Sequence, residues 1–146
     1  MKNPFITEIE RTFNKSKVLN SKFQEIGDQP SILFDFLLND APQKGALFIA
    51  ENDDFILLQI FVRYPHPIPS ENVPQVLTAL NGINSVSIAG FLMLTEEKNI
   101  QYIHYKSNLL LSNKSMEYNF PENELLIFIN SNLNLIGAFN QELFEK

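Results

Sequence analysis

Five apolar runs with the spacing of β-strands, all between positions 31 and 111, constrain the fold of this chain more than any other feature. Side chains on one face of a strand recur at every second residue, and the runs follow that period. The runs are, in chain order, residues 31–38, 46–50, 55–63, 86–94 and 100–111. Segments with helical periodicity precede the first run, separate the third from the fourth and follow the fifth. The sequence therefore predicts an α+β fold in the order α-β-β-β-α-β-β-α, with a mainly antiparallel sheet packed by helices.

The first helix is predicted to begin at Pro4, because Asn3 can cap the helix and proline suits its first turn. Apolar residues then recur at helical spacing as far as Phe13. Two continuations are open beyond that point. The helix can extend to Gly27, or residues 23–26 can begin an extended segment.

Two further helix starts share one local pattern, an asparagine followed two residues later by proline. The pattern occurs at Asn72 and at Asn119, and each time a Gln or Glu three residues on can reach back to the asparagine. Gly82 predicts the end of the middle helix, since glycine readily adopts the left-handed conformation that closes helices. The last helix is predicted from about residue 120 to the C-terminus.

The third run is apolar on both of its faces. Phe55, Leu57 and Phe61 belong to one face, and the even-numbered residues between 56 and 62 belong to the other. Exposure of either face to water would be unfavourable. The pattern predicts a central strand that is covered on both sides.

The C-terminal helix carries more apolar residues than contact with a single sheet requires. Leu125, Ile129 and Ile136 belong to its core stripe, while Leu126 and Leu133 help to widen the stripe to roughly half of the circumference. Either a second neighbour within the chain covers this excess, or a partner chain covers it.

Length and composition favour one domain, residues 1–146, with enough apolar residues to form a core without metals or crosslinks. The absence of cysteine excludes disulfides, thiolate zinc sites and cysteine nucleophiles. A formal net charge of -6 repels a phosphate backbone, so nucleic acid is not an expected partner. No apolar segment has the length of a membrane span or the character of a secretory signal, so no membrane contact and cytoplasmic residence are expected.

No group of residues has the spacing of a catalytic, cofactor or metal site. The five glycines are too far apart for a phosphate-binding loop. His66 and His104 have no neighbouring residues at metal-ligand spacing. The adjacent carboxylates at 53–54 and 96–97 fall at predicted hairpin tips, where they stay hydrated.

Asp35 interrupts the first apolar run. It is expected either to be partly buried and paired with Arg63 or Lys106, or to face outward on an edge strand.

Three short strings in the second half of the chain resemble the YbjN family, whose fold is similar to that of the type III secretion chaperones. The strings are residues 77–81, 88–94 and 100–106. In such proteins an asparagine closes the middle helix, a glycine and a phenylalanine lie in the fourth strand, and an I-x-Y element follows; Asn81, Gly90, Phe91 and Tyr102 match these features. The resemblance implies a bacterial, cytoplasmic and non-enzymatic protein, dimeric, that binds an extended segment of another protein.

The residues expected to contact a partner come from the first helix, the third run and the last helix. They are Phe5, Ile9, Phe13, Phe55, Leu57, Phe61, Leu126, Leu133 and Phe144. One hypothesis is a chaperone or adaptor that holds an extended or partly unfolded protein segment. The alternative is a regulatory or structural homodimer whose self-association consumes the surplus apolar surface and leaves no client site.

Overall fold

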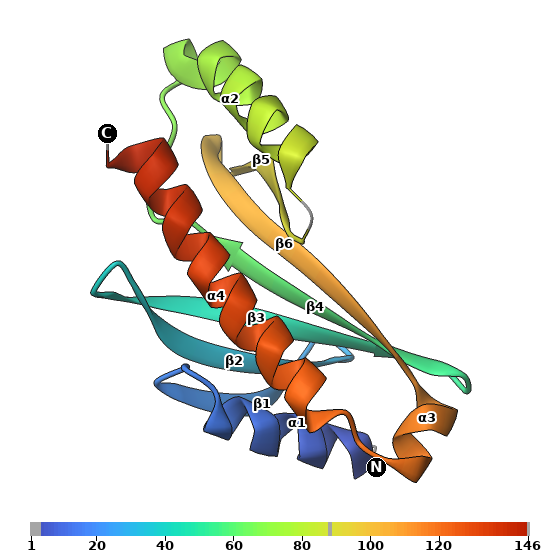
Figure 1. The fold of residues 1–146 in the computed structure, drawn as a ribbon. Coiled ribbons are helices and arrows are strands. Elements are labelled where there is room, and N and C mark those ends of the chain that lie inside the picture. The colour runs from blue at the N-terminus through green and yellow to red at the C-terminus, as the bar shows by residue number, and fades with distance from the viewer. Residues whose placement is uncertain (1–3, 88, 146) are drawn as a thin grey trace.

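The computed structural model describes residues 4–87 and 89–145, and the strands it contains form one six-stranded sheet (Figure 1). Its elements are α1 (Pro4–Lys15), β1 (Asn20–Ile26), β2 (Gln29–Leu38), β3 (Ala41–Glu51), β4 (Phe55–Arg63), the 3-10 turn η1 (Ser70–Asn72), α2 (Val73–Val86), β5 (Phe91–Glu97), β6 (Ile100–Ser112), α3 (Asn113–Tyr118) and α4 (Glu122–Phe144). The predicted α+β class and antiparallel sheet are confirmed. The structure adds β1 before the first predicted strand and α3 before the last helix.

Every neighbouring pair of strands in the sheet is antiparallel, and the spatial order is β1-β2-β3-β4-β6-β5. Strand β4 lies between β3 and β6, so its predicted central position is confirmed. The middle helix α2 lies between β4 and β5 in the chain, and the hairpin of β5 and β6 then joins the sheet at β4.

The segment after α1 is extended, as the second of the two open continuations requires. Helix α1 ends at Lys15, and β1 pairs with β2 with Phe23 opposite Ile32. Phe23 packs against the core from this position. Asn3, the predicted cap of α1, lies outside the described residues.

Strand β3 begins earlier than the sequence predicts because the turn before it is tight. Asn39 and Asp40 both adopt positive φ angles, 48° and 72°, and join β2 directly to β3 at Ala41. Asparagine and aspartate tolerate this conformation better than most residues, so two residues suffice for the turn.

The predicted end of α2 at Gly82 is wrong. The helix continues to Val86, and β5 begins at Phe91 rather than at residue 86. Ile83 continues the apolar stripe of α2 beyond Gly82 and packs against the core, so tertiary contact outweighs the preference of glycine for a helix end. Asn72 precedes the helix as predicted, but its side chain makes no capping hydrogen bond.

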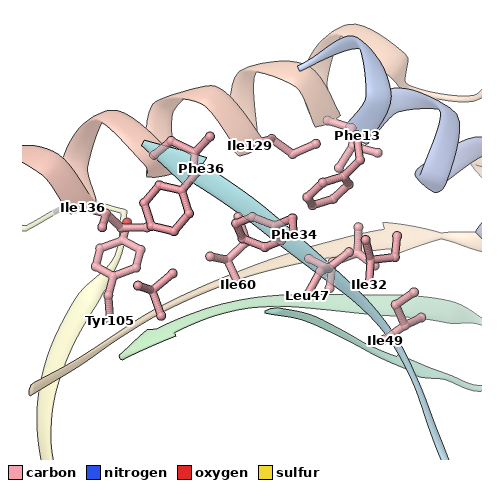
Figure 2. Packing of buried hydrophobic residues seen from close by; sticks show 14 of the residues in the cluster. Phe13, Ile32, Phe34, Phe36, Leu47, Ile49, Ile60, Tyr105, Ile129 and Ile136 are labelled. Atoms are coloured by element: carbon pink, nitrogen blue, oxygen red, sulfur yellow. The ribbon is translucent and has the colours of Figure 1, made fainter. Parts of the chain in front are cut away.

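The core lies on one side of the sheet. Alternate residues of β2 and β4 are buried there, for example Phe34 and Ile60, and they join α1 and α4 in a single cluster (Figures 1 and 2). The helix residues of this cluster include Phe13 of α1 and Ile129 and Ile136 of α4. The other residues of β4 remain half-exposed, so the prediction that both faces of this strand are covered is wrong for the described part of the chain. The helices cover one face only.

Two buried tyrosines fix α4 on the sheet. The hydroxyl of Tyr64 donates to the carbonyl oxygen of Ile136 at 2.9 Å, and the hydroxyl of Tyr105 donates to Oδ1 of Asn132. Asn132 in turn donates to the carbonyl oxygen of Phe128 at 2.7 Å. Burial raises the pKa of both phenols, so they remain protonated donors. A rotation of α4 about its axis would leave these polar groups without partners.

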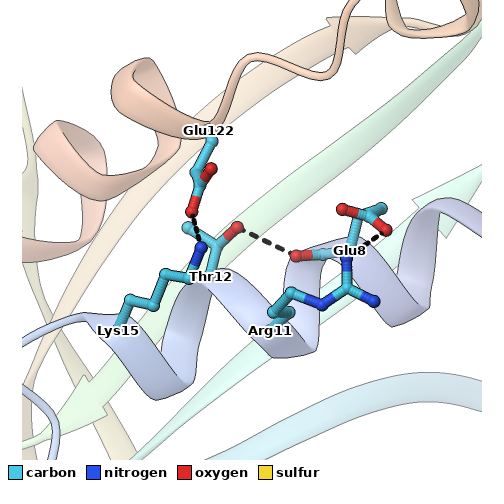
Figure 3. Close-up of polar contacts among 5 residues, drawn as sticks. All are labelled: Glu8, Arg11, Thr12, Lys15 and Glu122. Carbon is cyan, nitrogen blue, oxygen red and sulfur yellow. Dashed lines mark hydrogen bonds and ion pairs between the residues drawn. The ribbon is translucent and has the colours of Figure 1, made fainter.

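Exposed polar contacts supplement this packing at the ends of α1 and α4 (Figure 3). Nζ of Lys15 lies 2.5 Å from Oε1 of Glu122, and Arg11 pairs with Glu8 within α1 at 2.6 Å. Ion pairs at such exposed positions contribute about 0–1 kcal/mol each. The attachment of α1 therefore depends mainly on its buried apolar residues.

Gly45 leaves room for a buried aromatic ring. The ring of Phe34 lies between those of Phe13 and Phe36, at centroid distances of 5.4 and 5.8 Å. A Cβ atom at Gly45 would lie 2.5 Å from Cζ of Phe34 and 3.1 Å from Cγ2 of Val62. An alanine there would force these core side chains to move.

We expect Gly45→Ala to destabilise the protein by about 1–3 kcal/mol, because overpacking a close-packed core has costs of this order. The measurement is the free energy of unfolding in urea. Gly82→Ala is the matched control: no atom lies within 4 Å of the added Cβ, and it lies inside α2. The control should stabilise the protein by about 0.5–1 kcal/mol. Equal effects of the two substitutions would contradict the close contact at Gly45.

Candidate functional site

The face of the sheet opposite α1 and α4, which we call the open face, is the candidate site. The strand register places alternate residues of each strand on it: Phe61 of β4 lies opposite Lys106 of β6 and Ala46 of β3. The same pleat directs the neighbouring residues Ile60 and Val62 into the core.

Apolar side chains form a patch on the open face. The patch comprises Phe48, Phe55, Leu57, Phe61, Phe91 and Leu110. None of the six belongs to the core cluster, and Leu110 is 61% exposed. The rings of Phe48 and Phe61 lie 6.1 Å apart.

Three of the residues predicted to contact a partner, Phe55, Leu57 and Phe61, belong to this patch. The structure brings them together with Phe48 and Leu110, which sequence reasoning missed. Leu110 is opposite Leu57 in the pairing of β4 with β6. Only the strand register reveals that neighbour, because the two residues are far apart in the sequence.

The other predicted contact residues do not lie on the open face. Ile9 and Phe13 are fully buried and hold α1 against the sheet. Leu133 is also buried in the core, and Phe5 is half-buried against it. These four residues therefore face the protein's own core, and a partner would reach the buried ones only if α1 or α4 moved.

Phe144 and Leu126 lie on α4. The ring of Phe144 contacts those of Tyr64 and His66, at centroid distances of 5.8 and 4.4 Å. Leu126 is half-buried. Much of the apolar excess of this helix, notably Leu133 and Phe144, is thus covered by neighbours within the chain.

A second concavity runs between α2 and α4. It consists of two hollows of about 360 and 410 Å³, and Glu142 lines both of them. Phe144 lines the first hollow, and Val86 and Phe139 line the second. Sequence reasoning missed this groove because it ended α2 at Gly82, before the residues that form its second half.

A buried histidine of β6 lies beside Phe61 on the open face, because the strand register places His104 opposite Arg63 and Met93. The ring of His104 stacks on Phe61 at a centroid distance of 4.7 Å, and its side chain is 2% exposed. Nδ1 shares a hydrogen bond with Oγ1 of Thr95, while Nε2 makes no hydrogen bond and lies 3.9 Å from Oε1 of Glu97.

Charged side chains surround this histidine. Arg63 forms an ion pair with Glu97, and its guanidinium lies over the ring of Tyr102 at 4.5 Å. Nζ of Lys106 lies 5.8 Å from the centroid of the Phe61 ring. These contacts link β4, β5 and β6 across the open face.

Burial lowers the pKa of His104. The carboxylate of Glu97 opposes this shift, whereas Arg63 and Lys106 add to it. The imidazole is therefore neutral at pH 7.

The expected pairing of Asp35 with Arg63 or Lys106 is wrong. Its carboxylate accepts a hydrogen bond from Nζ of Lys44 at 2.9 Å, from the neighbouring strand β3. This bond lowers the pKa of Asp35. Asp35 and Lys44 both lie on the open face, on the half of the sheet formed by β1 to β3.

Residues 4–87 and 89–145 contain no group of three or more histidine, aspartate or glutamate side chains that could hold a metal ion. Within the same residues, no helix is both long enough and apolar enough to cross a membrane.

No family model matches the chain, and no curated protein matches it in sequence. The structure is similar to the crystal structure of YbjN from E. coli, which is described as a candidate transcription regulator. The two share 14% sequence identity at a TM-score of 0.50, over 95% of this chain and 93% of the other. This confirms the predicted YbjN-like fold. Identity this low shows the fold alone, and the likeness to type III secretion chaperones stays a prediction.

The buried, neutral state of His104 predicts a loss of stability in acid. The pKa of His104 in the folded protein lies below its ordinary value of 6.5, so the unfolded chain binds the proton more tightly. We expect the free energy of unfolding in urea to fall as the pH is lowered from about 7.5 to about 5.5, and His104→Gln to reduce that fall. His66→Gln, at an exposed histidine of the connector before α2, is the control. An unchanged pH dependence in His104→Gln would contradict the interpretation.

Proposed function

We propose that this chain is a non-enzymatic protein-binding module that holds an extended segment of another polypeptide on the open face of its sheet. The observation that carries the proposal is the apolar patch, whose residues lie outside the core cluster that α1 and α4 complete. Apolar side chains gathered on one exposed face mark an interaction site in soluble proteins.

An extended segment suits a sheet face better than a compact partner does. Its side chains alternate with the same period as those of the strands, so every second one can reach a single face. Phe48 and Phe61 provide flat apolar contacts. Leu57 and Leu110 form a second apolar area on the same face, beyond the hydrogen-bonded pair of Gln59 and Asn108. Client binding of this kind is typical of chaperones and adaptors.

Backbone pairing at the sheet edges would contribute unequally. At the β5 edge, the amide group of Asn84 in α2 both donates to the carbonyl oxygen of Leu92 and accepts from its N–H, each at 2.8 Å. The side chain thus occupies positions that an added strand would need. Among the described strands, β1 pairs with β2 alone and its other edge is free of a strand, so we propose that backbone bonds to a client form there.

A regulatory or structural homodimer is the second candidate. The observation that favours it is helix α2, which contains no charged residue and exposes 79% of Val86. In a chain with a net charge of -6, two copies repel each other less where charges are few, and Glu142 is the one charged residue among those that line the two hollows. In this case the groove between α2 and α4 is the interface, and the open face holds no client.

A photo-crosslinking amino acid at position 110 tests the first proposal in the native cell. Leu110 on the open face and Ile127 on the outer side of α4 are 61% and 65% exposed, which makes Ile127 a matched control. We expect crosslinks from position 110 to reproducible peptides of other proteins, and few from position 127.

Crosslinks from position 86 to a second copy, with none from position 110, would favour the homodimer. Equal yields at positions 110 and 127 would contradict a specific role for the open face.

A further inference from the structure

The open face differs in charge from the rest of the molecule. Its strands place four basic side chains there, Lys22, Lys44, Arg63 and Lys106, against the two carboxylates Asp35 and Glu97. The whole chain contains 11 basic and 17 acidic residues. Fifteen of the 17 acidic residues thus lie elsewhere, and the open face has a net positive charge in an acidic protein.

Three of the four cations, Lys22, Lys44 and Arg63, line a trough on the β1 to β3 half of this face. Two adjoining hollows of about 340 and 590 Å³ share Asn20, Asp35 and Lys44 in their linings. Lys22 lines the first hollow and Arg63 lines the second. Among the residues that line them, Asp35 is the single acidic one.

These cations are available to a ligand even where they already have a partner. Lys44 pairs with Asp35, yet its side chain is 86% exposed and can contact a second carboxylate. Arg63 is held by Glu97 and by the ring of Tyr102, which orients its guanidinium without covering it. Basic groups and the apolar patch are therefore adjacent on one surface.

We propose that the polypeptide segment held on the open face is acidic, with carboxylate side chains interspersed among apolar ones. This rests on the proposed function and names the chemistry of its partner. The carboxylates bind Lys22 and Lys44 in the trough, and the apolar side chains contact Phe48 and Phe61. Opposite charges across an interface speed association and exclude wrong partners.

Other occupants fit this surface less well. Single-stranded nucleic acid also binds aromatic and basic side chains on sheets, but it presents a phosphate at every nucleotide. Two of the four cations here already pair with carboxylates of the chain, and the net charge of -6 opposes a long polyanion. A second copy bound face to face would bring two positively charged surfaces together.

The experiment measures binding of the full chain to a soluble synthetic peptide of about twelve residues that contains glutamate, leucine and serine in alternation. A second peptide has glutamine in place of every glutamate, and a single-stranded oligo-dT of similar length is the third probe. We expect the acidic peptide to bind about tenfold more tightly than its amide counterpart, and less tightly as salt is raised.

A pair of double variants locates the binding. K22Q/K44Q removes two charges from the trough, and K17Q/K114Q removes two exposed charges from elsewhere. Only K22Q/K44Q should bind the acidic peptide more weakly than the unchanged protein does, by about tenfold. Three results would overturn the proposal. The two peptides could bind equally tightly, the two double variants could lose the same affinity for the acidic peptide, or oligo-dT could bind more tightly than the acidic peptide.

The outcome is separable from that of the crosslinking experiment. Crosslinks at position 110 together with equal binding of the two peptides would reject the acidic partner and retain the protein-binding module. Absence of crosslinks at position 110 would reject the module itself.

Discussion

Helix α4 crosses one face of the sheet, and its attachment there determines what the other face can do. Buried apolar residues such as Ile129 and Ile136 supply most of the contact, at about 1.5–3 kcal/mol for each side chain removed from water. The hydroxyls of Tyr64 and Tyr105 fix the rotation of α4 about its axis, because leaving a buried donor unpaired costs about 1–3 kcal/mol. With α1 beside it, α4 completes the core, and the open face remains without a helix among the described elements (Figure 1).

The open face combines apolar side chains, which favour removal from water, with charged side chains, which favour contact with water. Phe48, Phe61 and Leu110 favour contact with any apolar surface, whereas Lys106 and the Arg63–Glu97 pair keep water nearby. The side chain of Asn84 limits strand pairing at the β5 edge. The net effect is a surface that carries apolar and basic side chains together, which is the combination that the proposed function requires.

The alternation of β2 and the apolar character of both faces of β4 were readable from the sequence, and so was the helix that begins at Pro4. The burial of Ile9 and Phe13 in the protein's own core was not readable from the sequence. Both carry the helical spacing of a contact surface, and that spacing is the same whether the surface meets a partner or the protein's own sheet. The prediction that α2 ends at Gly82 was wrong for a related reason. Glycine locally favours a helix end, but the continued helix packs Ile83 against the core. Asn132 gave no signal at all, since only the fold brings Tyr105 within reach of it.

Local sequence by itself determined the five long strands and the three main helices, because periodicity and turn preference act between residues a few positions apart. It did not determine β1, α3 or the end of α2. It also determined that β4 would have two apolar faces. Only the tertiary structure decided that residues 56, 58, 60 and 62 would meet the helices while Phe55, Leu57 and Phe61 would face outward. That choice depends on strand register and on the position of α4. The contact between Tyr64 and Ile136 helps to set that position, and these residues are more than sixty positions apart in the chain. No local sequence pattern records contacts over such a distance.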